Sequence, residues 1–242
     1  MEKIKVTVWN EEREGEDRWQ PVQEMYPQGL HSVIADALNK ESDITARAAL
    51  LSDEEQGLTE SVLDNTDVLI WWAHGRHADV EDRFAQRVAE YVQRGMGVIF
   101  LHSAHRSKPF MRLLGTDGYL CWRDEGERER LWVSDPSHPI AAGLPESFSL
   151  EHEEMYGEPF GIPQPEATVF IGWYEGGNVF RSGVTFRRQC GKIFYFQPGH
   201  ETNETFYNPH IQRVIANAVR WAKPEIRVPA RGCPCVERLE KR

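Results

Sequence analysis

The sequence is poor in the features that define several large classes of protein. It contains four cysteines in 242 residues: Cys121 and Cys190 are isolated, and Cys233 and Cys235 form a short pair. Four scattered cysteines do not make the disulfide framework of a small secreted domain. One Cys-x-Cys pair is also weak evidence for a metal site. We therefore expect this pair to lie in an exposed extension.

Long apolar runs and an excess of positive charge are also missing. No run approaches the roughly 20 apolar residues that a membrane-spanning helix needs, and the first residues enter a strand pattern without the apolar core of a signal peptide. Lys and Arg number 28 against 38 Asp and Glu, a formal net charge of −10. A field of that sign repels a phosphate backbone. We expect a cytoplasmic protein that binds neither nucleic acid nor membrane.

Common catalytic and cofactor motifs are absent as well. No G-x-G-x-x-G segment follows a strand and no Walker loop is present, so we expect no nucleotide cofactor. There is no G-x-S-x-G nucleophile elbow. Ser103 does follow a predicted strand where such an elbow would lie, although its neighbours His102 and Ala104 do not spell out a tight glycine turn. A serine nucleophile therefore stays open as an alternative.

The first half of the chain alternates strand and helix patterns. Apolar runs and stripes predict strands at residues 3–9, 44–50, 67–72 and 97–101, and helices at 30–38, 58–63 and 80–92. Strands that are apolar on both faces and separated by helices are typical of a parallel sheet covered on both sides. The fold class expected for this half is α/β.

The second half has a different pattern. Two strand-like runs around residues 124–127 predict a hairpin within 119–133, and residues 134–165, rich in Pro and Gly, predict long loops. An antiparallel meander follows, with strands predicted at 168–173, 178–187 and 192–196.

The chain pattern ends with one more helix and a tail. Asn208 and Pro209 form an N-cap and N1 pair, and Pro224 ends the helix that they begin. We expect one domain over residues 1–224 and a C-terminal tail over residues 225–242. The tail has no apolar stripe, so it either remains disordered or packs on a sister subunit. We expect a homo-oligomer.

Histidines gather where predicted strands end. The third strand runs out into His74 and His77, the fourth into His102 and His105, and the last into His200. Ligands of open α/β sheets bind beyond the carboxyl ends of the strands. We therefore expect these imidazoles to meet in one cavity at one edge of the sheet.

Glu153 and Glu154 add carboxylates to this histidine cluster, which then has two possible uses. In the first, His74, His102, His200 and Glu154 hold Zn²⁺ or another borderline metal ion. In the second, His102, His200 and Glu153 perform acid–base catalysis near neutral pH. The sequence favours neither use over the other.

Aromatic side chains near the predicted strand ends are candidates for a binding rim. Trp9 and Trp19 flank the polar loop at the exit of the first strand, and Tyr156 follows the two glutamates. Such rings stack on the apolar faces of sugars and keep a polar edge for hydrogen bonding. We expect substrate contacts from Trp9 and Tyr156, with His77 and His105 beside them.

Four segments resemble the ThuA-like, trehalose-utilisation family. They are GVIFLHSA at 97–104, DPSHPIAAGLP at 135–145, EEMY at 153–156 and FYFQPGHE at 194–201. With the helix after Asn208, the likeness extends over about residues 3–223. The resemblance implies a class I glutamine amidotransferase-like, flavodoxin-like fold. This is a three-layer sandwich with a mostly parallel sheet and, here, an antiparallel extension.

The resemblance also implies a small sugar as ligand, namely trehalose or a related keto-disaccharide. Amidotransferases of this fold carry a nucleophilic cysteine just after the strand at 97–101, where this chain has His102 and Ser103, so glutamine hydrolysis is not expected. Their His–Glu pair corresponds loosely to His200 and Glu201. Three functions stay open: a metal-assisted carbohydrate-processing enzyme, a non-catalytic sugar-binding or regulatory subunit, and a hydrolase that uses Ser103.

Overall fold

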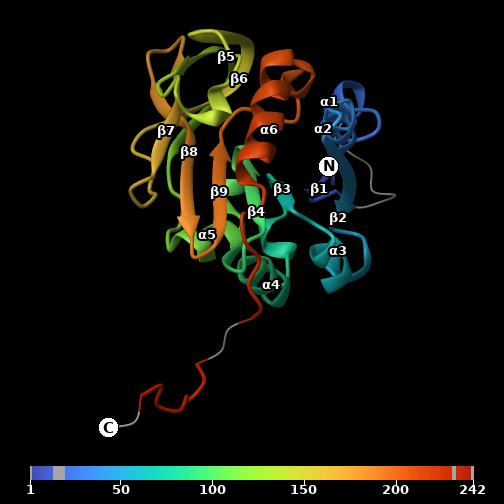
Figure 1. Ribbon diagram of the computed structural model, residues 1–242. Helices are drawn as coiled ribbons and strands as arrows, with labels where there is room; N and C mark the ends of the chain where they lie inside the picture. Colours follow the sequence, from blue (N-terminus) through green and yellow to red (C-terminus); the bar gives the residue numbers. More distant parts are fainter. Residues whose placement is uncertain (1, 13–19, 231–232, 241–242) are drawn as a thin grey trace.

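One mixed sheet with helices on both faces forms the body of the molecule (Figure 1). The computed structural model describes residues 2–12, 20–230 and 233–240. In this part of the chain the sheet has nine strands, in the order β2-β1-β3-β4-β9-β8-β7-β5-β6. The strands are β1 (Ile4–Asn10), β2 (Ile44–Leu50), β3 (Val68–Trp72), β4 (Gly97–Leu101), β5 (Cys121–Val133), β6 (Ser147–Gly157), β7 (Ala167–Tyr174), β8 (Val179–Arg188) and β9 (Gly191–Phe196).

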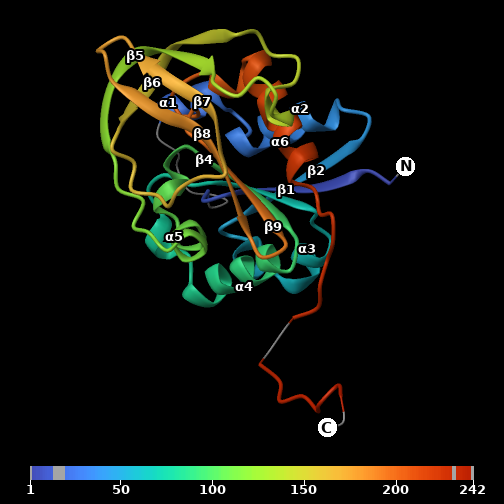
Figure 2. The same cartoon turned by 60° about the vertical axis from the view of Figure 1, so that its left-hand side comes forward.

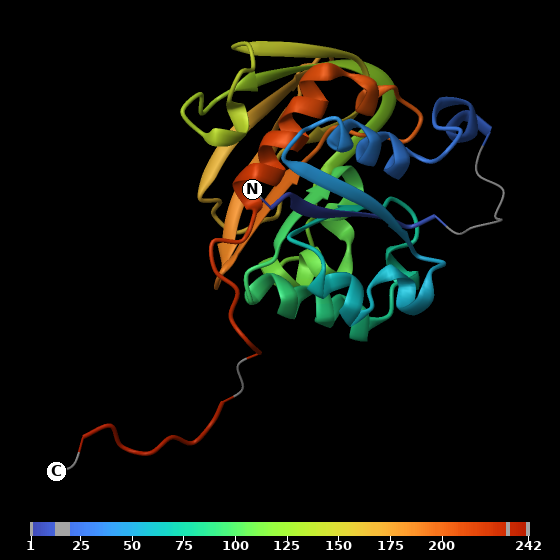
Figure 3. The ribbon, with the colours of Figure 1, turned by 45° about the vertical axis from the view of Figure 1, so that its right-hand side comes forward.

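The parallel half of the sheet consists of β2, β1, β3, β4 and β9. Helices cover both of its faces (Figure 3): α1 (Gln20–Met25), α2 (Leu30–Asn39) and α6 (Pro209–Ala222) lie on one side, and α3 (Glu60–Asp64), α4 (Asp82–Gln93) and α5 (Lys108–Leu114) on the other. Every residue of β3 and β4 is buried, as their continuous apolar sequences indicate. The expected three-layer α/β architecture is confirmed.

The antiparallel half of the sheet consists of β8, β7, β5 and β6 (Figure 2). It differs from the sequence prediction in two places. The hairpin predicted within 119–133 is wrong, because these residues form the single long strand β5, which pairs with both β6 and β7. Its register with β6 shifts between Arg123 and Glu127, and Gly126 adopts a φ of 64°. A local bulge, not a turn, explains the turn-like sequence here.

The long loops predicted for residues 134–165 are also wrong in part. Residues 147–157 form β6, which begins with alternating burial and ends with five consecutive buried residues. Its acidic run, Glu151 to Glu154, hid the strand, since such residues are uncommon in strands. Two short helices, α1 and α5, were likewise not predicted.

The last helix begins where the sequence indicates. The side chain of Asn208 accepts hydrogen bonds from the backbone N–H groups of His210 and Ile211, and Pro209 occupies the first turn. Beyond α6, the Arg227 guanidinium bonds to Thr66 and Asp67. Figure 1 shows the chain then leaving the body of the molecule. The homo-oligomer stays a prediction.

No helix among residues 2–12, 20–230 and 233–240 combines the length and the apolarity that crossing a membrane requires.

Candidate metal centre

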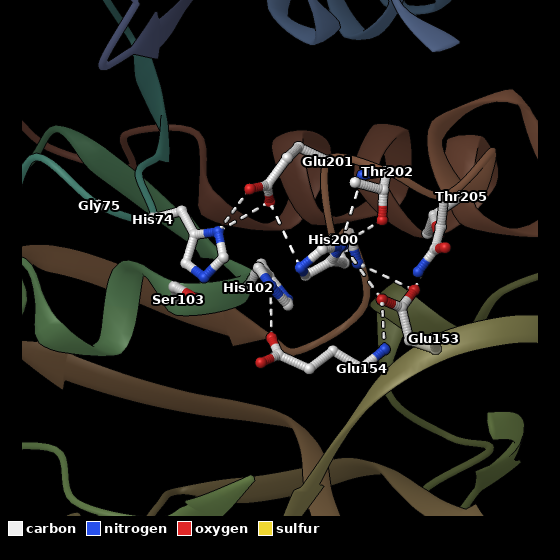
Figure 4. Close-up of polar contacts among 12 residues, drawn as sticks. His74, Gly75, His102, Ser103, Glu153, Glu154, His200, Glu201, Thr202 and Thr205 are labelled. Atoms are coloured by element: carbon white, nitrogen blue, oxygen red, sulfur yellow. Dashed lines mark hydrogen bonds and ion pairs between the residues drawn. The ribbon is translucent and has the colours of Figure 1, made fainter. Parts of the chain in front are cut away.

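Four side chains from four parts of the chain meet at the carboxyl edge of the parallel strands (Figure 4). His74 follows β3, His102 follows β4, His200 follows β9, and Glu154 lies in β6. Each offers one ligand atom, and these four atoms all lie within 4.8 Å of one another. The four residues expected as metal ligands are therefore together in the fold, three of them buried and His74 partly exposed.

A sharp backbone turn aims His102 at this cluster. His102 has a φ of 53°, a left-handed conformation that is uncommon outside glycine and frequent at functional sites. Its Nδ1 lies 3.0 Å from the carbonyl oxygen of Gln197. A carbonyl can only accept, so Nδ1 donates and Nε2 is left to face the cluster.

His74 is held by a carboxylate in the same manner. Both oxygens of Glu201 lie close to its Nδ1, at 2.7 and 2.8 Å. Burial disfavours an ionised Glu201, but the neighbouring imidazoles, His74 above all, outweigh burial and lower its pKa to about 2. A carboxylate that accepts from one nitrogen of an imidazole is the usual support of a metal-binding histidine.

The third imidazole has a hydroxyl partner. His200 Nδ1 lies 2.7 Å from Thr202 Oγ1, and the Thr202 backbone N–H, 3.4 Å away, also points at it. Nδ1 is thus turned toward Thr202, and Nε2 lies on the side of the ring that faces the cluster, 3.8 Å from a carboxylate oxygen of Glu201 (Figure 4). All three histidines can therefore present Nε2 to a common point.

Glu153, which the sequence predicted as a catalytic acid or base, points away from the cavity and into the loop before α6. Its Oε1 accepts from the backbone N–H groups of Glu154 and His200, and its Oε2 accepts from Gly199 N–H and Thr205 Oγ1. The side chain is fully buried and does not line the cavity described below. It fixes the loop that carries His200, so the geometry does not support the catalytic role predicted for it.

Two buried atoms of the cluster have only each other. His102 Nε2 and Glu154 Oε2 lie 3.0 Å apart, within ion-pair distance, and neither makes a hydrogen bond to any other described residue. Buried polar atoms are nearly always satisfied. Burial alone would lower the pKa of His102, but the adjacent Glu154 carboxylate outweighs burial and raises it to about 9. A metal ion that replaces the proton of His102 would bind both groups.

The spacing of the four ligand atoms suits one ion. In a tetrahedral Zn²⁺ site with bonds of ~2.0–2.2 Å, the ligand atoms lie about 3.3–3.6 Å apart, and the four atoms here all lie within 4.8 Å of one another. Binding one ion would therefore draw the side chains together by up to about 1 Å. Imidazoles with one carboxylate are the donor set of zinc and other borderline metals.

A cavity of about 690 Å³ opens above the cluster. Ser103 and Tyr156 line it, with Ser103 Oγ 2.7 Å from Tyr156 Oη. The Tyr156 ring stacks on His102, with ring centroids 5.2 Å apart. Tyr156 thus lines the cavity, and its contact with a substrate stays a prediction. For Ser103, the hydrogen-bond partner is a phenol rather than the imidazole that a serine nucleophile needs.

His77 and His105 form another part of the cavity wall. His105 Nδ1 donates to the carbonyl of Gly118 at 2.6 Å, whereas neither ring nitrogen of His77 has a hydrogen-bond partner among the described residues. Burial lowers the pKa of His77 to about 4 and that of His105 to about 3. Both rings are therefore neutral at pH 7 and can hydrogen-bond a ligand.

The rim contains different aromatic residues from those expected. Trp9 is 0% exposed, stacks on Trp71 at 3.8 Å and donates from Nε1 to the carbonyl of Gln56, so it belongs to the core. Trp19 lies outside the described residues. Besides Tyr156, the rings of Tyr119 and Trp122 line the cavity. Their polar sequence surroundings were the only signal that could have indicated an exposed position.

Solved structures with the same fold confirm the architecture. A ThuA-like protein from Parabacteroides merdae is 17% identical, with a TM-score of 0.68 and 94% of each chain covered. A cytoplasmic protein from Salmonella typhimurium is 13% identical, with a TM-score of 0.64 over 92% of this chain and 100% of that one. PurLQS from Thermotoga maritima is 14% identical, with a TM-score of 0.55 over 90% and 99% of the two chains.

These likenesses show the fold, which is of the class I glutamine amidotransferase-like type. A comparison with curated proteins gives no match. The family model described as "ThuA: Trehalose utilisation" matches residues 5–222, nearly the whole chain. By this match, the chain belongs to the ThuA trehalose-utilisation family.

Proposed function

We propose that this protein is a metal-dependent enzyme that acts on a carbohydrate of the trehalose or keto-disaccharide class. Family membership supports the link to trehalose use. The observation that carries the proposal is the set of three imidazoles and one carboxylate whose ligand atoms lie within 4.8 Å of one another at the base of a cavity. We also propose a cytoplasmic location, since a Salmonella protein of the same fold is described as cytoplasmic.

His74, His102, His200 and Glu154 are the residues that would hold the ion, with Zn²⁺ the best match to their chemistry. An ion bound here would polarise a sugar carbonyl or hydroxyl, or lower the pKa of a bound water. Glu201, the Gln197 carbonyl and Thr202 keep the three imidazoles in the required orientation.

The walls of the cavity supply the groups that bind and orient a polyhydroxylated ligand. The hydroxyls of Ser103 and Tyr156 form a pair that can donate and accept. Burial raises the pKa of Tyr156 well above its ordinary value, so its phenol keeps its proton. The neutral rings of His77 and His105 can hydrogen-bond further hydroxyls. A volume of about 690 Å³ falls within the ~300–1,000 Å³ typical of small-molecule sites.

Metal analysis of purified variants tests the centre. We expect close to one equivalent of bound metal in the unaltered chain and strong loss in Glu154→Gln, which changes charge with little change in shape, and in His102→Ala. His152→Ala is the matched control, because His152 is exposed and outside the cluster. Circular dichroism checks that each variant is folded. Equal, substoichiometric metal in folded samples of all four proteins would remove the metal from the proposal.

An activity screen then separates the enzyme from its alternatives. Trehalose and 3-keto-trehalose are incubated with the metal-loaded protein, with Glu154→Gln and with Ser103→Ala. Conversion that disappears in Glu154→Gln and survives in Ser103→Ala supports the proposed function. Binding without conversion favours a sugar-binding or regulatory subunit. Conversion that requires Ser103 and no metal favours the hydrolase alternative.

A further inference from the structure

We propose that Trp122 and Tyr119 form a second sugar subsite at the rim of the cavity, which holds the distal ring of a disaccharide. The reacting ring would then lie at the base of the cavity, beside the candidate metal centre. This inference rests on the proposed function and deepens it, because it names the residues that would select disaccharides over monosaccharides.

The two rim aromatics combine exposure with a position on the cavity. Trp122 is 66% exposed and Tyr119 is 52% exposed, and both line the cavity that opens above the histidines. Trp132, on the same strand as Trp122, is also exposed but does not line it. A ring beside a cavity offers a flat apolar surface to a ligand.

A direct path joins this rim to the base of the cavity. Trp122 in β5 is the cross-strand partner of Tyr156 in β6. Directly opposed side chains lie on the same face of a sheet, with their Cβ atoms ~5 Å apart. Tyr156 in turn stacks on His102. A ligand ring on Trp122 would therefore be the immediate neighbour of a ring seated beside Tyr156 and the histidines, as the two rings of a disaccharide require.

Backbone contacts hold Tyr119 at the rim. Gly161 N–H donates to the carbonyl of Tyr119 at 2.8 Å. A Cβ atom on Gly161 would come within 2.2 Å of the Tyr119 ring, so the ring packs closely on this glycine. Tyr119 N–H also donates to Asp117 Oδ1 at 3.3 Å. Because these contacts hold Tyr119 in place, binding requires little ordering of the rim.

Polar groups beside the rings favour a neutral polyhydroxylated ligand. Arg106 and Asp124 also line the cavity. One guanidinium nitrogen of Arg106 donates to the carbonyl of Asp117, which leaves other N–H groups for a ligand. The Asp124 carboxylate makes no hydrogen bond or ion pair to the residues that the structure describes, and it can accept. One acid and one base do not select an anion, whereas both can bond sugar hydroxyls whose C–H faces lie on Trp122.

Calorimetry with two sugars tests the subsite. Trehalose and glucose are titrated into the protein as purified and after addition of zinc, for the unaltered chain, Trp122→Ala, Trp122→Phe and Trp132→Ala. We expect Trp122→Ala to weaken trehalose binding by about tenfold and to change glucose binding less than twofold. The trehalose affinity of Trp122→Phe should lie between those of Trp122→Ala and the unaltered chain. Trp132→Ala should bind both sugars as the unaltered chain does.

The same titrations can contradict the proposed subsite, and the results that do so differ from those that contradict the proposed function. Trehalose affinity that is unchanged in Trp122→Ala, or an equal loss for both sugars, places the distal ring elsewhere. An unaltered chain that contains zinc but binds neither sugar overturns the subsite and the sugar substrate while leaving the metal centre. Sugar binding that shows the expected Trp122 effect in a chain that takes up no zinc after its addition supports the subsite and contradicts the metal-dependent function.

Discussion

Each imidazole of the candidate centre can offer Nε2 because its Nδ1 is already engaged. The partners differ: a carboxylate for His74, a backbone carbonyl for His102 and a hydroxyl for His200. Of these, only Glu201 carries a charge. Removing that charge should weaken metal binding without removing a ligand, because such supporting groups set the orientation and basicity of the ring that they contact.

We therefore expect Glu201→Gln to lower metal affinity by about 10- to 100-fold, as measured by competition with a chromophoric chelator. Glu204→Gln is the matched control, since Glu204 is an exposed glutamate three residues away, outside the cluster. Equal affinities in Glu201→Gln and the unaltered chain would show that the His74–Glu201 contact does not support a metal ligand.

Trp9 is a second residue whose role can be tested. The sequence predicted that Trp9 contacts a substrate at the rim of the cavity, whereas its burial places it in the hydrophobic core. Truncating a fully buried, stacked indole leaves a large hole, so Trp9→Ala should lower the free energy of unfolding by about 3–5 kcal/mol. Urea denaturation measures this loss, and metal content should not change while the variant is folded. Unchanged stability with reduced sugar binding would instead restore Trp9 to the rim.

At the scale of elements, β4 packs closely on α6, and this contact helps to fix the position of the strand that His102 follows. A Cβ atom on Gly97, the first residue of β4, would come within 2.3 Å of the Ala222 carbonyl oxygen, near the end of α6. Gly97→Ala forces these two elements apart, and we expect a loss of about 1–3 kcal/mol in urea denaturation. Gly75→Ala, whose nearest neighbour atom would be 3.9 Å away, should leave stability unchanged. Equal stabilities would mean that the two elements can separate freely.

The end of β6 is tied to β8 by an ion pair with a predictable response to pH. Burial raises the pKa of Glu158, but two hydrogen bonds from Arg181, at 2.7 and 2.9 Å, and two backbone N–H groups outweigh burial and lower it. Since the folded pKa is below the unfolded value of about 4.3, the contribution to stability is present above that value. It is lost as pH falls through the folded pKa.

Glu158→Gln should therefore be less stable than the unaltered chain by about 1 kcal/mol at pH 7, and the difference should shrink as the pH falls below about 4. Urea denaturation over this pH range measures it. A difference that is constant with pH would show that the effect comes from packing rather than from the charge of Glu158.

The elements also show what sequence patterns can and cannot predict. Apolar periodicity predicted the parallel strands and the α6 helix, because burial on one or both faces sets those patterns. It failed for β5 and β6: Gly126 and its acidic neighbours looked like a turn but form a bulge, and acidic residues obscured the strand that carries Glu154. In such long, partly exposed strands, pairing between distant segments outweighs local preference.

At the scale of the whole molecule, one rule of sheet topology made most of the candidate site predictable from the sequence. The carboxyl ends of parallel strands meet at one edge, so histidines after three of them were expected together, and the structure places them together. No local pattern could reveal that Glu153 turns into the loop as an anchor, or that Trp9 points into the core. Those outcomes depend on which donors and which hydrophobic surfaces the completed fold brings beside each side chain.

The most direct test of the central claim is an anomalous-scattering map, recorded at the zinc edge, from crystals of the metal-loaded protein. The account predicts one strong peak about 2.0–2.2 Å from the Nε2 atoms of His74, His102 and His200 and from a carboxylate oxygen of Glu154. A map with no peak at this point, or with its only peak at the Cys233 and Cys235 pair, would contradict it.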